Sequence, residues 1–225
     1  MAEHTNLGRF TKAALGRNYK LTRNEIGEDA RLSKLGMVFT TKSYDVRDIG
    51  HFCIMRLKAF GGMMKMETVI LAPTGVDAPL MNVDWVNVFG KETQIVEFYD
   101  TQLSPWADSL QAEMRKLALR DADLENRISE EHWYDGIRYS CSYNKSGKGL
   151  TERFNRAAQA YIGVYCAQLA EVPACDSDDR EEKRRRVKEF ATKLFENGGQ
   201  AVNMITKLFG EETARRVIIK HMYGT

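Results

Sequence analysis

Residues 37 to 100 form the part of the sequence that most constrains the fold. Five apolar runs follow one another there, joined by links of only a few residues. Two of the links carry turn glycines, at Gly61-Gly62 and at Gly90-Lys91. Parallel strands need crossover connections of roughly a dozen residues or more, and links this short exclude them. The run therefore predicts an antiparallel meander of strands and not a series of alternating βα units.

The rest of the chain is predicted to be mostly helical. Pro105 suits the first turn of a helix, and Thr151 is expected to cap a second one with an apolar stripe. Asp178 or Asp179 opens a strongly charged helix, which "ENGG" at 196–199 interrupts. Two further helical segments each end at a glycine, as helices often do.

One more strand is expected at residues 136–145, separated from the meander by a helix. An antiparallel sheet with helices contributed from outside the strand run indicates an α+β fold, a three-layer α/β/α sandwich with a central antiparallel sheet. We expect residues 1–36 to form an N-terminal arm and residues 37–225 to form a single domain.

Composition excludes some classes of function. The chain has 225 residues, 43% of them hydrophobic, and a formal net charge of +2. Strong binding to nucleic acid normally needs a basic face, so nucleic acid is not an expected partner. No apolar run approaches the roughly 18 residues that span a bilayer, and the N-terminus lacks the apolar core of a secretory signal. We expect a soluble, cytoplasmic protein with no membrane partner.

The familiar sequence signals of cofactor and metal chemistry are missing. The sequence contains no phosphate-binding P-loop, no GxGxxG, no HExxH and no GxSxG. Its four histidines are far apart, and its four cysteines form no CxxC pair, which indicates free thiols in a reducing compartment and no metal site. If the protein is an enzyme, positioned acids are expected to do the chemistry.

Asp100 is the acid with the most suggestive position. In a strand over 94–100, Val96, Phe98 and Asp100 point to one face, just before the chain breaks at Ser104-Pro105. Asp100 is either an ordinary aspartate at the end of a strand or an acid held where its proton is useful.

Four stretches in the same order resemble one known family. They are "METVILAPTGVDAPLMNVDWVNVFGKETQIVEFYDTQLSP", "WYDGIRYSCSY", "ERFNRAAQAYIGVYCAQLAEVP" and "ITKLFGEETARRVIIKHMYG". The series, over roughly residues 37 to 224, resembles the ferredoxin-dependent bilin reductases. Red chlorophyll catabolite reductases share that fold and fit the same stretches less closely.

The resemblance implies a monomeric reductase with no bound cofactor. Such enzymes hold an open-chain tetrapyrrole, a bilin such as biliverdin, between an antiparallel sheet and the C-terminal helices. Reduced ferredoxin supplies single electrons, and protein acids supply protons to a bilin radical. Asp100 matches the central aspartate of the family. An acid beside an apolar ligand has its charged form disfavoured, so its pKa rises and it can donate a proton.

Three positions depart from the family pattern. Thr68 stands where the phycocyanobilin-forming branch has a histidine, and Arg56 stands where that branch has a glutamate, so a four-electron reduction relying on these groups is not expected. Asn197 or Glu196 replaces the second aspartate of other branches. Thr68 lines the pocket or is an ordinary strand residue. Arg56 pairs with a propionate or with Asp100, or lies on the sheet surface.

The remaining candidates each have two interpretations. Asn197 holds a substrate carbonyl or caps a helix. Met66 belongs to a flexible pocket wall or to the core. Lys145 and Lys148 bind the propionates or lie in a solvated loop, and the basic run 183–186 docks ferredoxin or is a solvated helix face.

Three functions follow from these observations. The first is reduction of one bilin double bond, with Asp100 as the proton donor. The second is binding of a tetrapyrrole without reduction. The third is cofactor-free catalysis on a smaller conjugated substrate.

Overall fold

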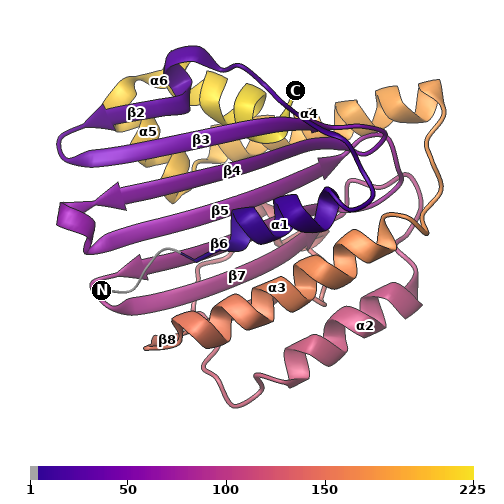
Figure 1. The fold of residues 1–225 in the computed structure, drawn as a ribbon, viewed down its shortest axis with the longest axis horizontal. Helices are drawn as coiled ribbons and strands as arrows, with labels where there is room; N and C mark the ends of the chain where they lie inside the picture. Colours follow the sequence, from indigo (N-terminus) through magenta and orange to yellow (C-terminus); the bar gives the residue numbers. More distant parts are fainter. Residues whose placement is uncertain (1–4) are drawn as a thin grey trace.

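The computed structural model describes residues 5–225, which build one antiparallel sheet with helices on both faces (Figure 1). Eight strands are present in this part of the chain, in the order β1-β3-β4-β5-β6-β7-β8, with β2 paired to β3 as well. The predicted three-layer sandwich with a central antiparallel sheet is confirmed. The strands are β1 (Leu21–Arg23), β2 (Arg31–Lys34), β3 (Met37–Val46), β4 (Gly50–Ala59), β5 (Met64–Pro73), β6 (Leu80–Val88), β7 (Lys91–Tyr99) and β8 (Tyr143–Lys148).

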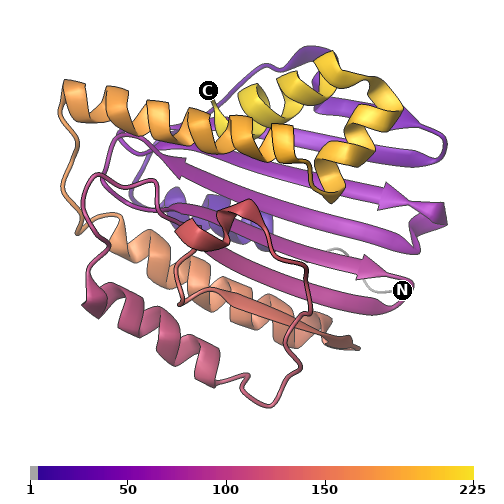
Figure 2. The ribbon, with the colours of Figure 1, turned by 180° about the vertical axis from the view of Figure 1, so that it is seen from behind.

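The helices divide between the two faces of the sheet (Figures 1 and 2). The first three cover one face, and the C-terminal ones cover the other, with a π-helical segment at the end of the chain. Three short 3₁₀ turns, η1 (Gly27–Ala30), η2 (Phe60–Gly62) and η3 (Trp133–Ile137), join the elements. The helices are α1 (Leu7–Leu15), α2 (Asp108–Leu119), α3 (Thr151–Gln168), α4 (Ser177–Asn197), α5 (Gln200–Phe209), α6 (Glu211–Arg215) and the π-helical η4 (Arg216–Met222).

Two hydrophobic cores result, one on each side of the sheet. Because side chains alternate along a strand, each central strand supplies both cores. Val96 and Phe98 of β7 pack on the side of α3, where the Phe98 ring lies 5.5 Å from that of Tyr165. Tyr99, one residue further, packs on the opposite side against Phe190 of α4, at 4.7 Å between ring centroids.

Several predicted boundaries are wrong for local reasons. The strand expected at 136–145 starts only at Tyr143, because residues 133–137 turn in a 3₁₀ helix. Leu150, and not Thr151, occupies the N-cap position of α3, since the Thr151 hydroxyl donates instead to buried Glu92. The charged helix begins earlier than expected, because Asp176 is its N-cap and accepts a hydrogen bond of 2.9 Å from a backbone N–H.

The segment expected to be an N-terminal arm belongs to the sheet and its first helical layer. Residues 1–4 lie outside the described residues. From residue 5 onward, α1 packs on the sheet, and β1 and β2 both pair with β3. A boundary at residue 37 therefore does not separate two structural units.

The four cysteines, Cys53, Cys141, Cys166 and Cys175, are all free and buried, as expected. No helix within residues 5–225 is long and apolar enough to cross a bilayer.

The turn between β2 and β3 leads to a first testable expectation. Leu35 and Gly36 form it with φ angles of 52° and 74°, and the Leu35 side chain is 82% exposed. Two-residue turns with two positive φ angles favour Asn-Gly, and a bulky residue is strained there. Leu35→Asn is therefore expected to raise the free energy of unfolding by about 1 kcal/mol, measured by urea denaturation. Leu35→Val, which is β-branched, is expected to lower it, and equal stabilities of all three proteins would contradict the explanation.

Candidate functional site

A cavity of about 190 Å³ lies between the sheet and the C-terminal helices. The strands β4 to β7 form its floor, and α4, α5 and η4 form its roof, with one side closed by the segment around η3. The floor residues are Met55, Met66, Thr68, Asn82, Asp84, Val86, Ile95, Glu97 and Tyr99.

Strand register brings the polar groups of the floor together. Thr68 of β5 stands directly opposite Asp84 of β6, and Asn82 stands opposite Glu97 of β7. Residues two apart on a strand share a face, so all four side chains point to the cavity side. The Thr68 hydroxyl donates to Asp84 Oδ1, and Asn82 Nδ2 donates to Asp84 Oδ2 at 2.6 Å. Four polar residues thus meet on the floor of the cavity, among the apolar side chains of Met55, Met66 and Ile95.

Asp84 has the environment of a proton-holding acid. Burial raises the pKa of its carboxyl group, and the neighbouring charge of Glu97 raises it further. The hydrogen bonds from the neutral donors Thr68 and Asn82 lower this pKa, and so, more weakly, does the positive charge of Arg127. Desolvation is the largest of these effects, so the pKa of this half-buried carboxyl is raised overall, which is the direction that favours a general acid.

Glu97 differs from Asp84 in having a cation as its partner. Its Oε1 accepts from Arg138 Nη1 at 2.9 Å and from Asn144 Nδ2 at 3.0 Å, while the Tyr99 hydroxyl donates to its other oxygen at 2.5 Å. Glu97 raises the pKa of Arg138 by this pairing, against the effect of burial. Two neighbouring carboxyls in unlike surroundings are a common arrangement for separating a proton donor from a charged partner.

The other walls of the cavity combine aromatic rings with a few polar groups. His132 stacks on Tyr134 with ring centroids 4.8 Å apart, and burial raises the pKa of Tyr134 to about 12. The buried Nδ1 atom of His132 has no hydrogen-bond partner among the described residues. Arg127 is the one cation in this lining, as far as residues 5–225 show. The cavity is therefore lined by a protonated phenol, an imidazole ring and a guanidinium group around a central acid.

The structure does not bring Asp100 to this cavity. Asp100 follows the last residue of β7 and shares the strand parity of Val96 and Phe98, which face α3. Its side chain is exposed and accepts a 3.4 Å hydrogen bond from the backbone of Gln102. The role of Asp100 as a proton donor stays a prediction. Its exposed position favours the other interpretation, an ordinary aspartate at the end of a strand.

The other predicted residues fall into two groups. Thr68 and Met66 line the cavity. Asn197 is exposed at the end of α4 and donates to the Lys193 carbonyl at 2.8 Å, while the two glycines after it reach the cavity. The two predicted lysines lie elsewhere: Lys145 donates to the Leu124 carbonyl and to Asn126, and Lys148 is exposed opposite Lys91.

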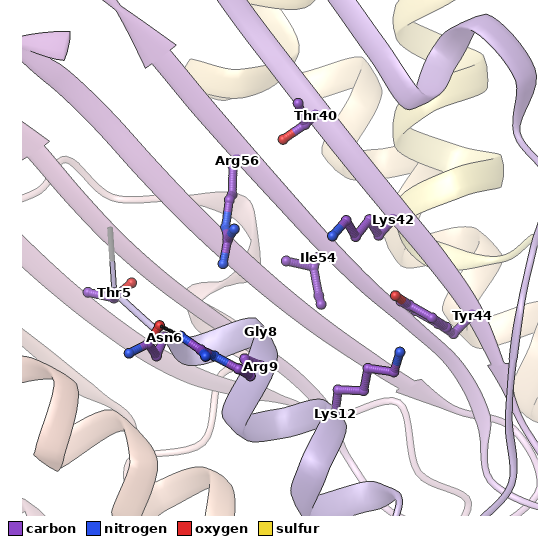
Figure 3. A pocket seen from close by; sticks show the side chains of 10 residues that line it. All are labelled: Thr5, Asn6, Gly8, Arg9, Lys12, Thr40, Lys42, Tyr44, Ile54 and Arg56. Atoms are coloured by element: carbon purple, nitrogen blue, oxygen red, sulfur yellow. Dashed lines mark hydrogen bonds between the residues drawn. The ribbon is translucent and has the colours of Figure 1, made fainter. Parts of the chain in front are cut away.

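Arg56 points to the opposite face of the sheet, toward α1 (Figure 3). There its guanidinium group binds the buried carboxylate of Glu67, with 2.7 Å between Nη2 and Oε1. The basic run 183–186 is also not a uniform patch. Lys183 is fully buried and donates to two backbone carbonyls, and Arg185 and Arg186 both pair with Glu182.

Sequence reasoning missed Asp84 as a site residue, although a signal was present. Asn82 and Asp84 are polar residues at alternate positions of the run "LMNVDWVNVF", so they share one face of a strand predicted to lie inside the meander. Glu97, Tyr134 and Arg127 had no such signal, because only tertiary packing brings them to the cavity.

Comparisons with known proteins support the fold that the resemblance to the bilin reductases implied. No family model matches the chain, and no curated protein matches it. Among solved structures, the chain is similar to phytochromobilin synthase from tomato in complex with biliverdin, with a TM-score of 0.78 and 13% sequence identity. The alignment covers 97% of this chain and 82% of that one. The chain therefore has the fold of phytochromobilin synthase, a fold that the resemblance to the bilin reductases implied.

Proposed function

We propose that the protein is a ferredoxin-dependent reductase of an open-chain tetrapyrrole and that Asp84 gives a proton to the substrate. The position of Asp84 carries this proposal: a carboxyl group that forms no salt bridge within residues 5–225 projects from a central strand into a cavity under the C-terminal helices. The likeness to a structure that holds biliverdin supports the class of substrate. The exposed position of Asp100 favours Asp84 over Asp100 for the role of donor.

Reducing one double bond takes two electrons and two protons. In this proposal reduced ferredoxin delivers the electrons one at a time, without a bound cofactor in the protein. Once the bilin has accepted the first electron it is more basic, and the carboxyl proton of Asp84 moves to it. The second electron is followed by a second proton, which comes from solvent either directly or by reprotonating the Asp84 carboxylate. Thr68 and Asn82 hold the carboxyl group in place through their hydrogen bonds, which keeps the donor oriented during the transfer.

The remaining cavity residues fit the parts of a bilin. The apolar floor and the aromatic rings suit the conjugated pyrrole system. Arg127 suits a propionate carboxylate, the task that the sequence assigned to Lys145, Lys148 or Arg56.

The small volume of the cavity favours a second candidate function, catalysis on a smaller substrate. Sites for drug-sized ligands usually measure about 300–1,000 Å³, and this cavity measures about 190 Å³. A bilin therefore requires it to widen, and Gly198-Gly199 in its wall is the link where the backbone is least restrained. A smaller conjugated substrate needs no such change, so catalysis on a smaller molecule is the alternative.

Two optical measurements test the proposal. Adding biliverdin to the protein is expected to shift and sharpen the visible absorption of the pigment. Adding ferredoxin, its reductase and NADPH without oxygen is then expected to change this spectrum with time. A bound spectrum that stays constant would indicate a tetrapyrrole carrier, and no bound spectrum would favour the smaller substrate. The monomeric state and the cytoplasmic location stay predictions.

A further inference from the structure

A second hollow, of about 720 Å³, lies on the opposite side of the sheet from the cavity (Figure 3). Helix α1 forms one wall of it, and the strands β3 and β4 form the floor. Its size is within the usual range of small-molecule sites.

The side chains around this hollow are strongly basic. Arg9 and Lys12 come from α1, Lys42 from β3 and Arg56 from β4. No aspartate or glutamate is among the lining residues in the part of the chain that the structure describes. This concentration of charge stands out in a chain whose net charge is only +2.

Only one of these four cations has a carboxylate partner. Arg56 binds Glu67, which is fully buried. Arg9 donates to the neutral amide oxygen of Asn6 at 2.7 Å, and the Lys12 ammonium lies 4.9 Å from the centre of the Tyr44 ring. Within residues 5–225, Arg9, Lys12 and Lys42 form no ion pair. About three positive charges are therefore left without compensation around one hollow.

The arrangement of these charges opposes folding. Arg9 and Lys12 are three residues apart on α1, so they are neighbours on its surface. Lys42 stands opposite Ile54, two residues from Arg56, so Lys42 and Arg56 are diagonal neighbours on one face of the sheet. Like charges at such spacings repel, and a bound anion would turn the repulsion into attraction.

The floor of the hollow is held in place. Helix α1 lies so close to β4 that a Cβ atom on Gly8 would come 2.6 Å from the Ile54 side chain. Glu67 fixes the start of α1 by accepting hydrogen bonds from the Thr5 hydroxyl at 2.6 Å and from the Gly8 N–H at 3.1 Å. The cations of helix and strands are thus kept at a set separation before any ligand arrives, which lowers the entropic cost of binding.

We propose that this hollow binds a small organic anion that carries a pyrophosphate group. About three uncompensated positive charges match the charge of a pyrophosphate ester. Lysine ammonium groups and arginine guanidinium groups are the usual phosphate ligands, the first as point charges and the second as a planar fork. The hydroxyl groups of Thr40 and Tyr44, which also line the hollow, supply further donors.

Titration calorimetry of the full chain with pyrophosphate at low ionic strength tests this proposal. One saturable site is expected. Lys42→Glu is expected to raise the dissociation constant for pyrophosphate by about 10-fold or more, because it removes a charge-assisted contact and adds repulsion. Lys188→Glu is the matched control, since Lys188 is exposed on α4, on the other side of the sheet. The control is expected to stay within about 2-fold of the wild type, because screening reduces distant charge effects.

Other results would overturn the proposal. Absence of a saturable site would do so, as would an equal effect of Lys42→Glu and Lys188→Glu. Citrate binding as tightly as pyrophosphate would show a general response to anion charge. A glutamate-rich peptide binding more tightly than pyrophosphate would assign the hollow to an acidic protein segment. The readout uses no bilin, so it is independent of the function proposed for the cavity.

Discussion

The Asp84→Asn variant is expected to bind biliverdin with little change in affinity and to reduce it at least about 100-fold more slowly than the wild type. Removal of a positioned proton donor typically costs 10²–10⁴-fold in rate. Asparagine keeps the shape of aspartate and can still accept the Thr68 hydrogen bond, but it has no carboxyl proton to give. Single-turnover spectra under anaerobic conditions measure the rate, and a static titration with the pigment measures the affinity.

Asp100→Asn is the matched control for this experiment. It makes the same chemical change at an exposed carboxyl outside the cavity, so turnover is expected to stay within about 2-fold of the wild type. The reverse result, with Asp100→Asn inactive and Asp84→Asn active, would restore the donor expected from the sequence and contradict the one proposed from the structure.

Asp84→Asn is also expected to change stability: it slows the reaction but makes the folded protein more stable at high pH. The folded state raises the pKa of the Asp84 carboxyl group, mainly through burial. A group of this kind contributes stability below its unfolded pKa, and this contribution is lost as the pH rises through the folded pKa. Above that range the wild type carries a charge on a half-buried carboxyl group, which Asp84→Asn does not. Urea denaturation is therefore expected to show the variant gaining stability over the wild type as the pH rises from 4 toward 8. A difference that does not depend on pH would contradict the raised pKa.

Local sequence patterns were sufficient to predict the five central strands of the sheet. The strands from β3 to β7 follow from alternation with period two and from short turns, both of which are properties of neighbouring residues. The shared face of Val96 and Phe98 was also correct, whereas Asp100 lies just beyond the end of β7. Parity states which residues share a face, but it does not state which helices cover that face. Helices α4 to η4 follow β7 by more than 70 residues of sequence, and their packing on the face of Asp84 is a long-range outcome.

The N-terminal elements were missed for a related reason. β1 and β2 are only 3 and 4 residues long, too short for a reliable alternation. The position of α1 depends on Glu67, which lies about 60 residues away and reads in the sequence as an ordinary charged residue on a strand. A buried acid that anchors a distant helix leaves no periodic signal.

Glu67→Ala is expected to lower the free energy of unfolding by about 3 kcal/mol and to release α1 from the sheet. The Glu67 carboxylate is fully buried, and it accepts hydrogen bonds from Thr5, Gly8 and Arg56. Removing one partner of a buried pair typically costs about 3–5 kcal/mol, and the lower end applies because the Arg56 side chain is 37% exposed and can reach water. Urea denaturation measures the loss, and faster tryptic cleavage at Arg9 and Lys12 reports the release of the helix.

Glu67→Gln separates the charge of this side chain from its shape. The amide can still accept from Gly8 and Arg56 but lacks the negative charge, so about half of the loss is expected. Thr68, the next residue of β5, faces the cavity on the other side of the sheet. Glu67→Ala is therefore expected to abolish pyrophosphate binding, because α1 carries Arg9 and Lys12, while folded protein still binds biliverdin. Loss of both ligands together in folded protein would show that the two sides of the sheet are coupled, and an intact, protease-resistant α1 would show that Glu67 is not its anchor.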